Sequence, residues 1–328
     1  MNWKALANRI LDGGEPISRE EALAVLNSSD DELLEVLQAA YLIRKNWFGK
    51  KVSLHVLKNA KSGVCPEDCS FCSQSKTSTA EVAEYEMQSA DEIVAGAAEA
   101  MEMQALRYCV VTSSRAPSEG ELKIITEAAS RIKAANPQLE LCASMGFLTE
   151  EKAQRLKDSG VDRFNHNLET SANFYPSICS THQYEDRVET AKTVKKVGLD
   201  LCCGGLIGMG ETLEDRVDLA LALKELQADS APINFLDPRE GTELEGQERL
   251  TPNDCLRTLA MFRFVLTHAE VRIAGGRETC LRHLQPLSLY PANSMFTNGY
   301  LTTGGSGYEA DKQMIEDAGF ELGHLVNA

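Results

Sequence analysis

The stretch NAKSGVCPEDCSFCSQ, residues 59–74, places Cys65, Cys69 and Cys72 within eight positions. A structural zinc site normally takes four closed ligands, usually from two Cys or His pairs, and no second pair lies nearby. Thiolates are also the ligands of iron–sulfur clusters, and three thiolates on a four-iron cluster leave one iron open to a small molecule. The spacing therefore favours an iron–sulfur site. The alternative is a zinc site in which a distant histidine completes the three cysteines.

The composition is that of an acidic globular protein. Hydrophobic residues make up 43% and charged residues 25% of the 328 residues, which is typical of a folded enzyme with a substantial core. The formal net charge of −16 argues against a nucleic-acid partner and against an anionic membrane, both of which attract basic surfaces. No apolar run has transmembrane length, and the acidic N-terminal segment is unlike a secretory signal or a transit peptide. We therefore expect a cytoplasmic protein whose ten cysteines stay reduced.

From residue 50 onward, short apolar or β-branched runs alternate with amphipathic helical segments. The expected strands are KVSLHVL (51–57), LRYCVV (106–111), LELCAS (139–144), DRFNHN (162–167), LDLCCG (199–204), APINFL (231–236), EVRIAG (270–275) and ANSMF (292–296). Eight strands with intervening helices over roughly 250 residues suit an α/β fold of the (β/α)8 barrel (TIM barrel) type, with an open doubly wound sheet as the alternative. The three-cysteine loop directly follows the first strand, which would place it at the C-terminal mouth of a barrel.

Capping signals mark the starts of several helices. A hydroxyl three residues before a carboxylate satisfies exposed N–H groups, and such pairs are Ser89 with Glu92, Ser118 with Glu121, and Thr212 with Asp215. Similar pairs begin at Ser18 and Ser29, so residues 1–50 are expected to form an N-terminal helical extension. We expect one domain over residues 51–328, the barrel with a C-terminal segment, preceded by this extension.

The cysteine loop is similar to a known signature. C-x-x-x-C-x-x-C with an aromatic residue, here Phe71, before the last cysteine resembles the motif of the radical S-adenosylmethionine (SAM) superfamily. From about residue 2 to 323 the chain resembles the biotin synthase family, in the stretches LKNAKSGVCPEDCSFCSQS, FNHNLETS, GGLIGMGET, PINFL, VRIAGGRE, LQPLSLYPANSMF and LTT. The resemblance implies a radical SAM barrel with sulfurtransferase activity that converts dethiobiotin to biotin. The alternatives are another radical SAM enzyme of this architecture (a maturase or mutase) and a non-catalytic zinc or electron-transfer protein.

The resemblance implies three cofactors. Cys65, Cys69 and Cys72 would hold a 4Fe–4S cluster whose open iron chelates SAM. Reductive cleavage of SAM would then yield a radical that takes hydrogen from an unactivated methyl carbon. The sulfur would come from a 2Fe–2S cluster, and the family ligands of that cluster match Cys109, Cys142, Cys202 and Arg272.

The second ligand set has a plainer interpretation from the residues alone. Cys109, Cys142 and Cys202 lie in predicted strands, where a cysteine most often serves as a small buried hydrophobic residue. Arg272 is an unusual ligand, because a guanidinium is effectively always protonated and offers only donors. A purely electrostatic role is therefore the alternative for Arg272.

The resemblance also assigns contacts to SAM and to the substrate. The implied SAM contacts are Phe71, Asn167, Glu169 (where the family often has Asp at the ribose) and Leu206 (on the adenine side). Asn165 and Asn167 alternate along one strand, so both amides should face the mouth, which suits a ureido ring that needs donors and acceptors. The implied substrate contacts are Asn165, Asn167 and Asn234 near that ring, and Thr302 and Thr303 at the carboxylate.

Four further cysteines are not among the ligands that the resemblance implies. Cys203 follows Cys202 directly, so it should point toward the outer helices, since successive strand residues face opposite sides. We interpret Cys179, Cys255 and Cys280 as bystanders. The expected partners are dethiobiotin, a reducing electron-transfer protein and a second copy of the chain in a homodimer.

Overall fold

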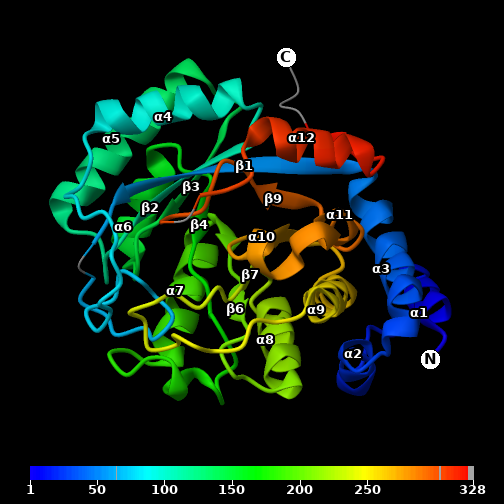
Figure 1. Cartoon of the computed structure of the whole chain (residues 1–328). Coiled ribbons are helices and arrows are strands. Elements are labelled where there is room, and N and C mark those ends of the chain that lie inside the picture. The colour runs from blue at the N-terminus through cyan, green and yellow to red at the C-terminus, as the bar shows by residue number, and fades with distance from the viewer. Residues whose placement is uncertain (64, 303, 324–328) are drawn as a thin grey trace.

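Eight parallel strands close into a barrel in the computed structural model, which describes residues 1–63, 65–302 and 304–323 (Figure 1). The ring comprises β1 (Lys51–Lys61), β2 (Arg107–Thr112), β3 (Glu140–Ser144), β4 (Arg163–Asn165), β5 (Asp200–Cys202), β7 (Ser230–Phe235), β8 (Glu270–Ile273) and β9 (Ser294–Phe296). Pairing of Ser53, Leu54 and His55 with residues 294–296 joins β1 to β9 and closes the ring. The expected barrel is confirmed, and each of the eight predicted strands overlaps an observed one.

Two short strands were not predicted. β6 (Gly205–Ile207) continues the line of β5 after a break at Cys203 and Gly204 and pairs with β7. β10 (Glu321–Leu322) pairs with Lys51 and Val52 at the start of β1. Neither strand is long enough to show the alternation of side chains on which a strand prediction depends.

Helices surround the barrel, and their capping residues agree with the sequence. The outer helices are α4 (Ala90–Glu102), α5 (Glu119–Ala135), α6 (Glu150–Asp158), α7 (Tyr184–Val197), α8 (Leu213–Glu225) and α9 (Pro252–Val265). Complete capping boxes begin α4 at Ser89, α5 at Ser118 and α8 at Thr212, and Thr251 caps α9. These helices therefore start where local hydrogen bonding favours it.

The first helices lie against the outside of the barrel. α1 (Trp3–Leu11), α2 (Arg19–Leu26), the 3-10 turn η1 (Asp30–Glu32) and α3 (Leu33–Phe48) pack beside α8 and α9 (Figure 1). Arg44 of α3 is fully buried and donates to the carbonyls of Gly49, Lys51 (2.7 Å) and Ala292 (3.2 Å). These bonds fix α3 to the start of β1 and to the segment before β9.

The connection between β8 and β9 is built from short helical turns, which explains its weak helical pattern. It contains α10 (Arg277–Leu281), the 3-10 turn η3 (Arg282–Leu284) and α11 (Gln285–Ser288). Nη2 of Arg277 donates to both carboxylate oxygens of Asp311, at 2.8 and 2.9 Å, in α12 (Tyr308–Asp317). The same carboxylate accepts from Thr297 (2.7 Å). Within the described parts of the chain, no helix has both the length and the apolar character needed to cross a bilayer.

Gly204, between β5 and β6, tests how tightly the barrel wall is packed. A Cβ atom there would lie 1.9 Å from the carbonyl oxygen of Pro232, so the backbone of β7 would have to move. We expect Gly204→Ala to lower the free energy of unfolding by about 2 kcal/mol, because overpacking in a tight core costs about that much. Urea denaturation followed by circular dichroism measures the change.

The matched control is Gly120→Ala in α5, where a Cβ meets nothing closer than 4.0 Å. Alanine favours a helix more than glycine does, so Gly120→Ala should leave the protein equally or slightly more stable. Equal stability of the two variants would contradict the close contact between Gly204 and Pro232 of β7.

Candidate active site

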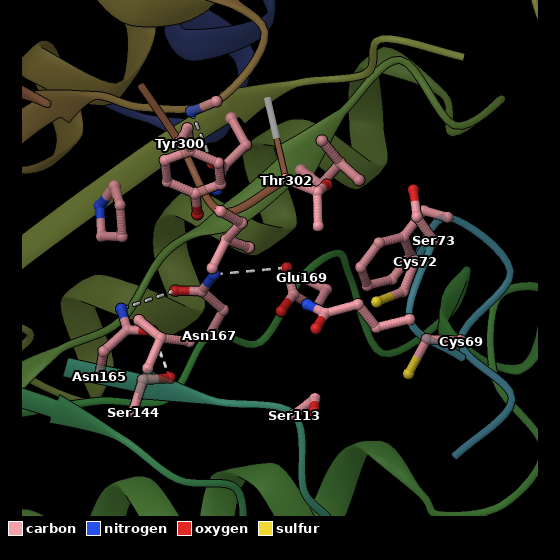
Figure 2. A pocket seen from close by; sticks show the side chains of 18 of the residues that line it. Cys69, Cys72, Ser73, Ser113, Ser144, Asn165, Asn167, Glu169, Tyr300 and Thr302 are labelled. Atoms are coloured by element: carbon pink, nitrogen blue, oxygen red, sulfur yellow. Dashed lines mark hydrogen bonds between the residues drawn. The ribbon is translucent and has the colours of Figure 1, made fainter. Parts of the chain in front are cut away.

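A cavity of about 390 Å³ occupies the C-terminal mouth and the upper lumen of the barrel (Figure 2). The two sets of residues that the sequence singled out meet in it. Its lining includes Cys65, Cys69, Cys72, Cys109, Cys142 and Arg272. Cys202 lies within contact of this wall and is fully buried. The structure therefore brings both thiol sets to one enclosed space.

Backbone hydrogen bonds shape the cysteine loop at the mouth. The N–H of Cys65 donates to the carbonyl of Gln74 (2.9 Å), and the N–H of Cys72 donates to that of Cys69 (3.1 Å). The side chains of Cys65 and Cys72 are partly exposed, and that of Cys69 is buried. Burial raises the pKa of Cys72 to about 11 and also raises the pKa of Cys65. Metal binding to these thiols therefore has to displace protons.

Cys109, Cys142 and Cys202, here called the inner thiols, come together from three strands, β2, β3 and β5. Cys109 and Cys142 are direct neighbours in the register of β2 and β3. A hydrogen bond from Cys142 lowers the pKa of the Cys109 thiol, and contact with Cys109 raises that of Cys142. Cys109, Cys142 and Cys202 form one buried cluster with Ala274 and Phe296, whereas Cys203 packs in the outer core. Cys202 thus faces the lumen and Cys203 faces the helices, as strand alternation predicts.

Arg272 approaches the inner thiols as a hydrogen-bond donor. Its Nη1 lies 3.4 Å from Cys202 Sγ, while Nε and Nη2 donate to Oε1 of Glu270 at 3.1 and 2.5 Å. Burial opposes its charge, but Cys202 and Glu270 together raise the pKa of Arg272. In this geometry the guanidinium is charged, and ligation of a metal through Nη1 would require the loss of a proton.

Glu270 is the centre of a buried charge network below the thiols. Its carboxylate accepts two bonds of 3.1 Å from Arg107 and one of 2.9 Å from Ser294 Oγ, in addition to those from Arg272. Burial opposes ionisation, yet Arg107 and Arg272 lower the pKa of Glu270 well below its usual value. Glu270 thereby directs the remaining arm of Arg272 toward Cys202.

Asn165, Asn167 and Glu169 lie in a row along the cavity wall that leads toward Cys72 of the cysteine loop (Figure 2). Asn165 Nδ2 lies 3.2 Å from Cys202 Sγ and 3.3 Å from Asn167 Oδ1. Asn167 Nδ2 in turn lies 3.5 Å from Glu169 Oε2. Asn234 also lines the cavity, where it donates to the carbonyl of Gly205 (3.1 Å) and accepts from the N–H of Gly275 (2.9 Å). Each amide has capacity for a further partner, because a carboxamide offers two N–H groups and two lone pairs.

The predicted SAM contacts lie nearer the mouth. Phe71, Leu206 and Glu169 line the cavity with Asn167. Glu169 has a φ of 69°, in the left-handed region that non-glycine residues seldom adopt. Burial raises the pKa of Glu169, and Arg187 Nη1, 3.8 Å from its Oε1, opposes that shift. A non-glycine residue held in this conformation on a cavity wall is typical of a functional position.

The segment after β9 covers part of the cavity. Thr302 and Tyr300 line it, and the Tyr300 ring packs against Phe296 at 5.3 Å between centroids. Thr302 is exposed and accessible to a ligand. Thr303, the second predicted carboxylate contact, lies outside the described residues.

Sequence reasoning missed Arg187 and Glu270. The side chain of Arg187 in α7 is 11% exposed and lines the cavity, where Nη1 donates to the carbonyl of Asn167 (3.0 Å) and Nε to the hydroxyl of Tyr175. A signal for Arg187 was available, because it shares a helix face with the buried Ala191 and Val194, four and seven positions further on. Glu270 gave no such signal, since a charged residue at the start of a strand is usually exposed.

The remaining cysteines do not line the cavity. Cys255 and Cys280 contact each other in the outer core, so Cys280 does not reach the inner thiols. Cys179, which we interpreted as a bystander, lies with its Sγ 3.9 Å from that of Cys69. It is buried in the segment before α7, where that segment contacts the cysteine loop.

Comparison with known proteins identifies the family. The family model of the radical SAM superfamily matches residues 60–223, and that of the biotin and thiamin synthesis associated domain matches residues 232–321. The chain is 51% identical to the biotin synthase of Salinibacter ruber, over 97% of this chain and 88% of the relative. The chain belongs to the biotin synthase family. The biotin synthase of Anoxybacillus flavithermus is 50% identical over 98% of this chain and 97% of the relative.

Solved structures extend the likeness at the level of the fold. Methylornithine synthase superposes with a TM-score of 0.85 at 17% identity, covering 98% of each chain. An FeFe-hydrogenase maturase from Carboxydothermus hydrogenoformans superposes with a TM-score of 0.82 at 16% identity, over 98% of this chain and 79% of that one. At these identities the likeness concerns the barrel alone.

Membership of the radical SAM and biotin synthase families implies a 4Fe–4S cluster, SAM and a 2Fe–2S cluster. The residues present fit these groups. Soft thiol donors suit iron–sulfur clusters, and they occur here as two sets on one cavity. Near the inner set, Arg272 and Asn165 both direct N–H groups at Cys202 Sγ, as expected where sulfur carries negative charge.

Replacement of Glu270 tests the charge network below the inner thiols. We expect Glu270→Gln to lower the free energy of unfolding by about 3 kcal/mol, because removal of one partner leaves buried charge uncompensated. The same variant should alter the visible spectrum of the reconstituted 2Fe–2S site, since Arg272 loses the carboxylate that orients it. Denaturation by urea and optical spectroscopy measure the two effects.

Glu35→Gln, on the exposed face of α3, is the matched control and should change neither property. An unchanged stability and an unchanged spectrum for Glu270→Gln would together show that Arg272 is held in place by other contacts.

Proposed function

We propose that this biotin synthase inserts sulfur into dethiobiotin within the barrel lumen and takes the sulfur from a 2Fe–2S cluster on the inner thiols. One observation carries the proposal: the cysteine loop lines the same cavity as Cys109 and Cys142, and the amides of Asn165 and Asn167 lead from Cys202 to Glu169 along its wall. A substrate held by these amides would lie between the two sets. Family membership supports the reaction, and the positions of the residues support the route of the sulfur.

Unactivated C–H bonds have no usable acidity, so the bound groups have to supply the difficult chemistry. When bound, SAM with the 4Fe–4S cluster supplies hydrogen abstraction from such carbons, and the 2Fe–2S cluster supplies sulfur. Cys65, Cys69 and Cys72 would hold the first cluster, and the inner thiols with Arg272 the second. The protein itself contributes position and enclosure.

The cavity residues orient the reactants. Asn165, Asn167 and Asn234 present donors and acceptors that match the N–H and C=O groups of a ureido ring. Asn167 joins the substrate region to the SAM region, since its amide also lies beside Glu169. We assign Glu169 to the SAM ribose, Leu206 to the adenine side and Phe71 to the wall beside the cysteine loop.

Arg272 and Glu270 keep the inner site in a fixed arrangement. The guanidinium is held by Glu270 at two nitrogens and directs the third at Cys202 Sγ. In its charged form Arg272 can thus stabilise negative charge on the Cys202 sulfur. The inner thiols lie among buried apolar side chains, which would limit the access of water to this end of the lumen.

Other expectations remain predictions. We propose dethiobiotin as the substrate, a reducing electron-transfer protein as the source of electrons, and a homodimer as the assembly. A cytoplasmic location would keep the thiols reduced. We also propose the division of the chain at residue 50, with the helical extension before it and the barrel after it.

Removal of single thiols separates the cleavage of SAM from the insertion of sulfur. In single-turnover assays with SAM and dethiobiotin, we expect Cys142→Ala to cleave SAM but to form almost no biotin, because its sulfur source is incomplete. Cys65→Ala should do neither, because the site that binds SAM is lost. Product analysis by mass spectrometry measures both, with Cys203→Ala as the control that removes a thiol outside the lumen. If Cys142→Ala formed as much biotin as wild type, the inner site would not be the sulfur source.

Thr302 tests the position of the substrate carboxylate. We expect Thr302→Val to raise the Kd for dethiobiotin about tenfold, because a hydrogen bond to a charged group contributes roughly 1.5 kcal/mol. Thr302→Ser keeps the hydroxyl and should bind like wild type. Isothermal titration calorimetry in the presence of SAM measures the affinities. Equal affinities of the two variants would remove Thr302 from the carboxylate site.

A further inference from the structure

Cys179 and His182 form a set of metal-binding groups with Cys69 at the edge of the cysteine loop. The ligand atoms of these three residues all lie within 4.8 Å of one another, and all three side chains are buried. Cys179 and His182 belong to the segment between η2 (Tyr175–Ser177) and α7, far from Cys69 in the sequence. The fold thus places two soft donors from a second segment against one thiol of the loop.

The spacing of these donors matches tetrahedral zinc. With Zn–S bonds of about 2.3 Å, two thiolates on one zinc ion lie roughly 3.8 Å apart. The Sγ atoms of Cys69 and Cys179 are 3.9 Å apart. A thiolate and an imidazole nitrogen on the same ion lie about 3.6 Å apart. The two ring nitrogens of His182 lie 3.3 Å (Nδ1) and 3.7 Å (Nε2) from Cys179 Sγ.

Two carboxylates lie beside these donors. His182 Nδ1 lies 2.6 Å from Oε2 of Glu67, and a metal bound at Nε2 would leave that contact in place, the pairing common behind zinc-bound histidines. Glu67 is itself held by Arg115 Nη1 at 2.7 Å. Asp68 Oδ1 lies 3.2 Å from Cys179 Sγ and also accepts from the N–H groups of Ser180 (3.0 Å) and Thr181 (3.1 Å), so it fixes the segment that carries Cys179.

We propose that, in the cluster-free chain, Cys69, Cys179 and His182 bind a thiophilic divalent cation such as Zn²⁺. The site is distinct from the three-cysteine zinc site considered from the sequence, because only one thiol of the loop takes part. That thiol is Cys69, which the 4Fe–4S cluster would also need. Zinc at this site and the 4Fe–4S cluster are therefore mutually exclusive.

The competition favours zinc when both metals are available. Zn²⁺ binds a given nitrogen and sulfur site more tightly than Fe²⁺ does. A zinc ion on Cys69 would hold that thiol against Cys179 and keep the loop from accepting a cluster. Cys179 thereby makes cluster assembly in this chain sensitive to zinc, and a chain without this thiol should be less sensitive.

The experiment uses the full-length cluster-free chain under anaerobic conditions. A Cys142→Ala background removes one inner thiol, so that the lumen does not hold a zinc ion of its own. We expect this protein to bind one equivalent of Zn²⁺, with two sulfur ligands and at least one nitrogen ligand by X-ray absorption spectroscopy. Adding Cys179→Ser should weaken zinc binding by more than about tenfold. Loss of a group that only supports a metal ligand already lowers the metal affinity by about tenfold or more, and loss of a ligand should cost at least as much.

Two comparisons keep the test independent of folding and of turnover. Cys203→Ala in the same background removes an outer-core thiol and should leave zinc binding unchanged. His182→Gln should weaken binding as Cys179→Ser does, and thermal denaturation shows whether each variant is folded. If either variant fails to fold, the ligand set of the parent protein still decides the question.

Assembly provides the second readout. One equivalent of Zn²⁺, added before iron and sulfide, should suppress the visible absorption of the 4Fe–4S cluster in the parent and much less in the Cys179→Ser protein. Zinc bound by three sulfur atoms without nitrogen, or with an affinity that Cys179→Ser leaves unchanged, would overturn the proposal. So would the absence of zinc binding. None of these outcomes depends on biotin formation, so they do not test the proposed function, which the single-turnover assay tests separately.

Discussion

Closure of the parallel sheet is the constraint on which the site depends. Because β9 pairs with β1, alternate side chains of all eight strands have to share one lumen. This brings Arg272 of β8 within 3.4 Å of Cys202 of β5, although the two strands are not neighbours. In an open sheet with the same sequence, thiols on β2 and β3 and a guanidinium on β8 would lie on distant strands. The inner site is therefore a product of closure.

The lumen is layered because strand residues face it at every second position. Arg107 and Glu270 form a charged layer, and Cys109 and Arg272, two residues further along the same strands, form the next. Asn234 and the Asn165–Asn167 pair follow, and the cysteine loop lies at the mouth. Buried charges are tolerated only when paired, so the charged layer is fixed by its own ion pairs. The charged layer therefore gives the side chains above it a rigid support.

Much of this could be read from the sequence, because it depends on local patterns. Short apolar and β-branched runs predicted the eight strands, and strand alternation predicted the opposite directions of Cys202 and Cys203. Hydroxyl–carboxylate pairs predicted helix starts such as that at Ser89. The relations that escaped prediction are tertiary. Nothing local marks Glu270 as the partner of two arginines, or Cys179 as a neighbour of Cys69, since both contacts join distant segments.

The surroundings of the thiols separate ordinary core cysteines from those that face a function. Cys203 and Cys255 pack among apolar side chains, where a thiol acts as a small hydrophobic residue. Cys202, equally buried, instead receives N–H groups from Arg272 and Asn165. Glu270 compensates the charge of the buried Arg272 through two of its nitrogens, and the third nitrogen is directed at Cys202. Two N–H donors aimed at one sulfur suit negative charge on that sulfur, which a bound metal cluster would provide and an apolar core would not.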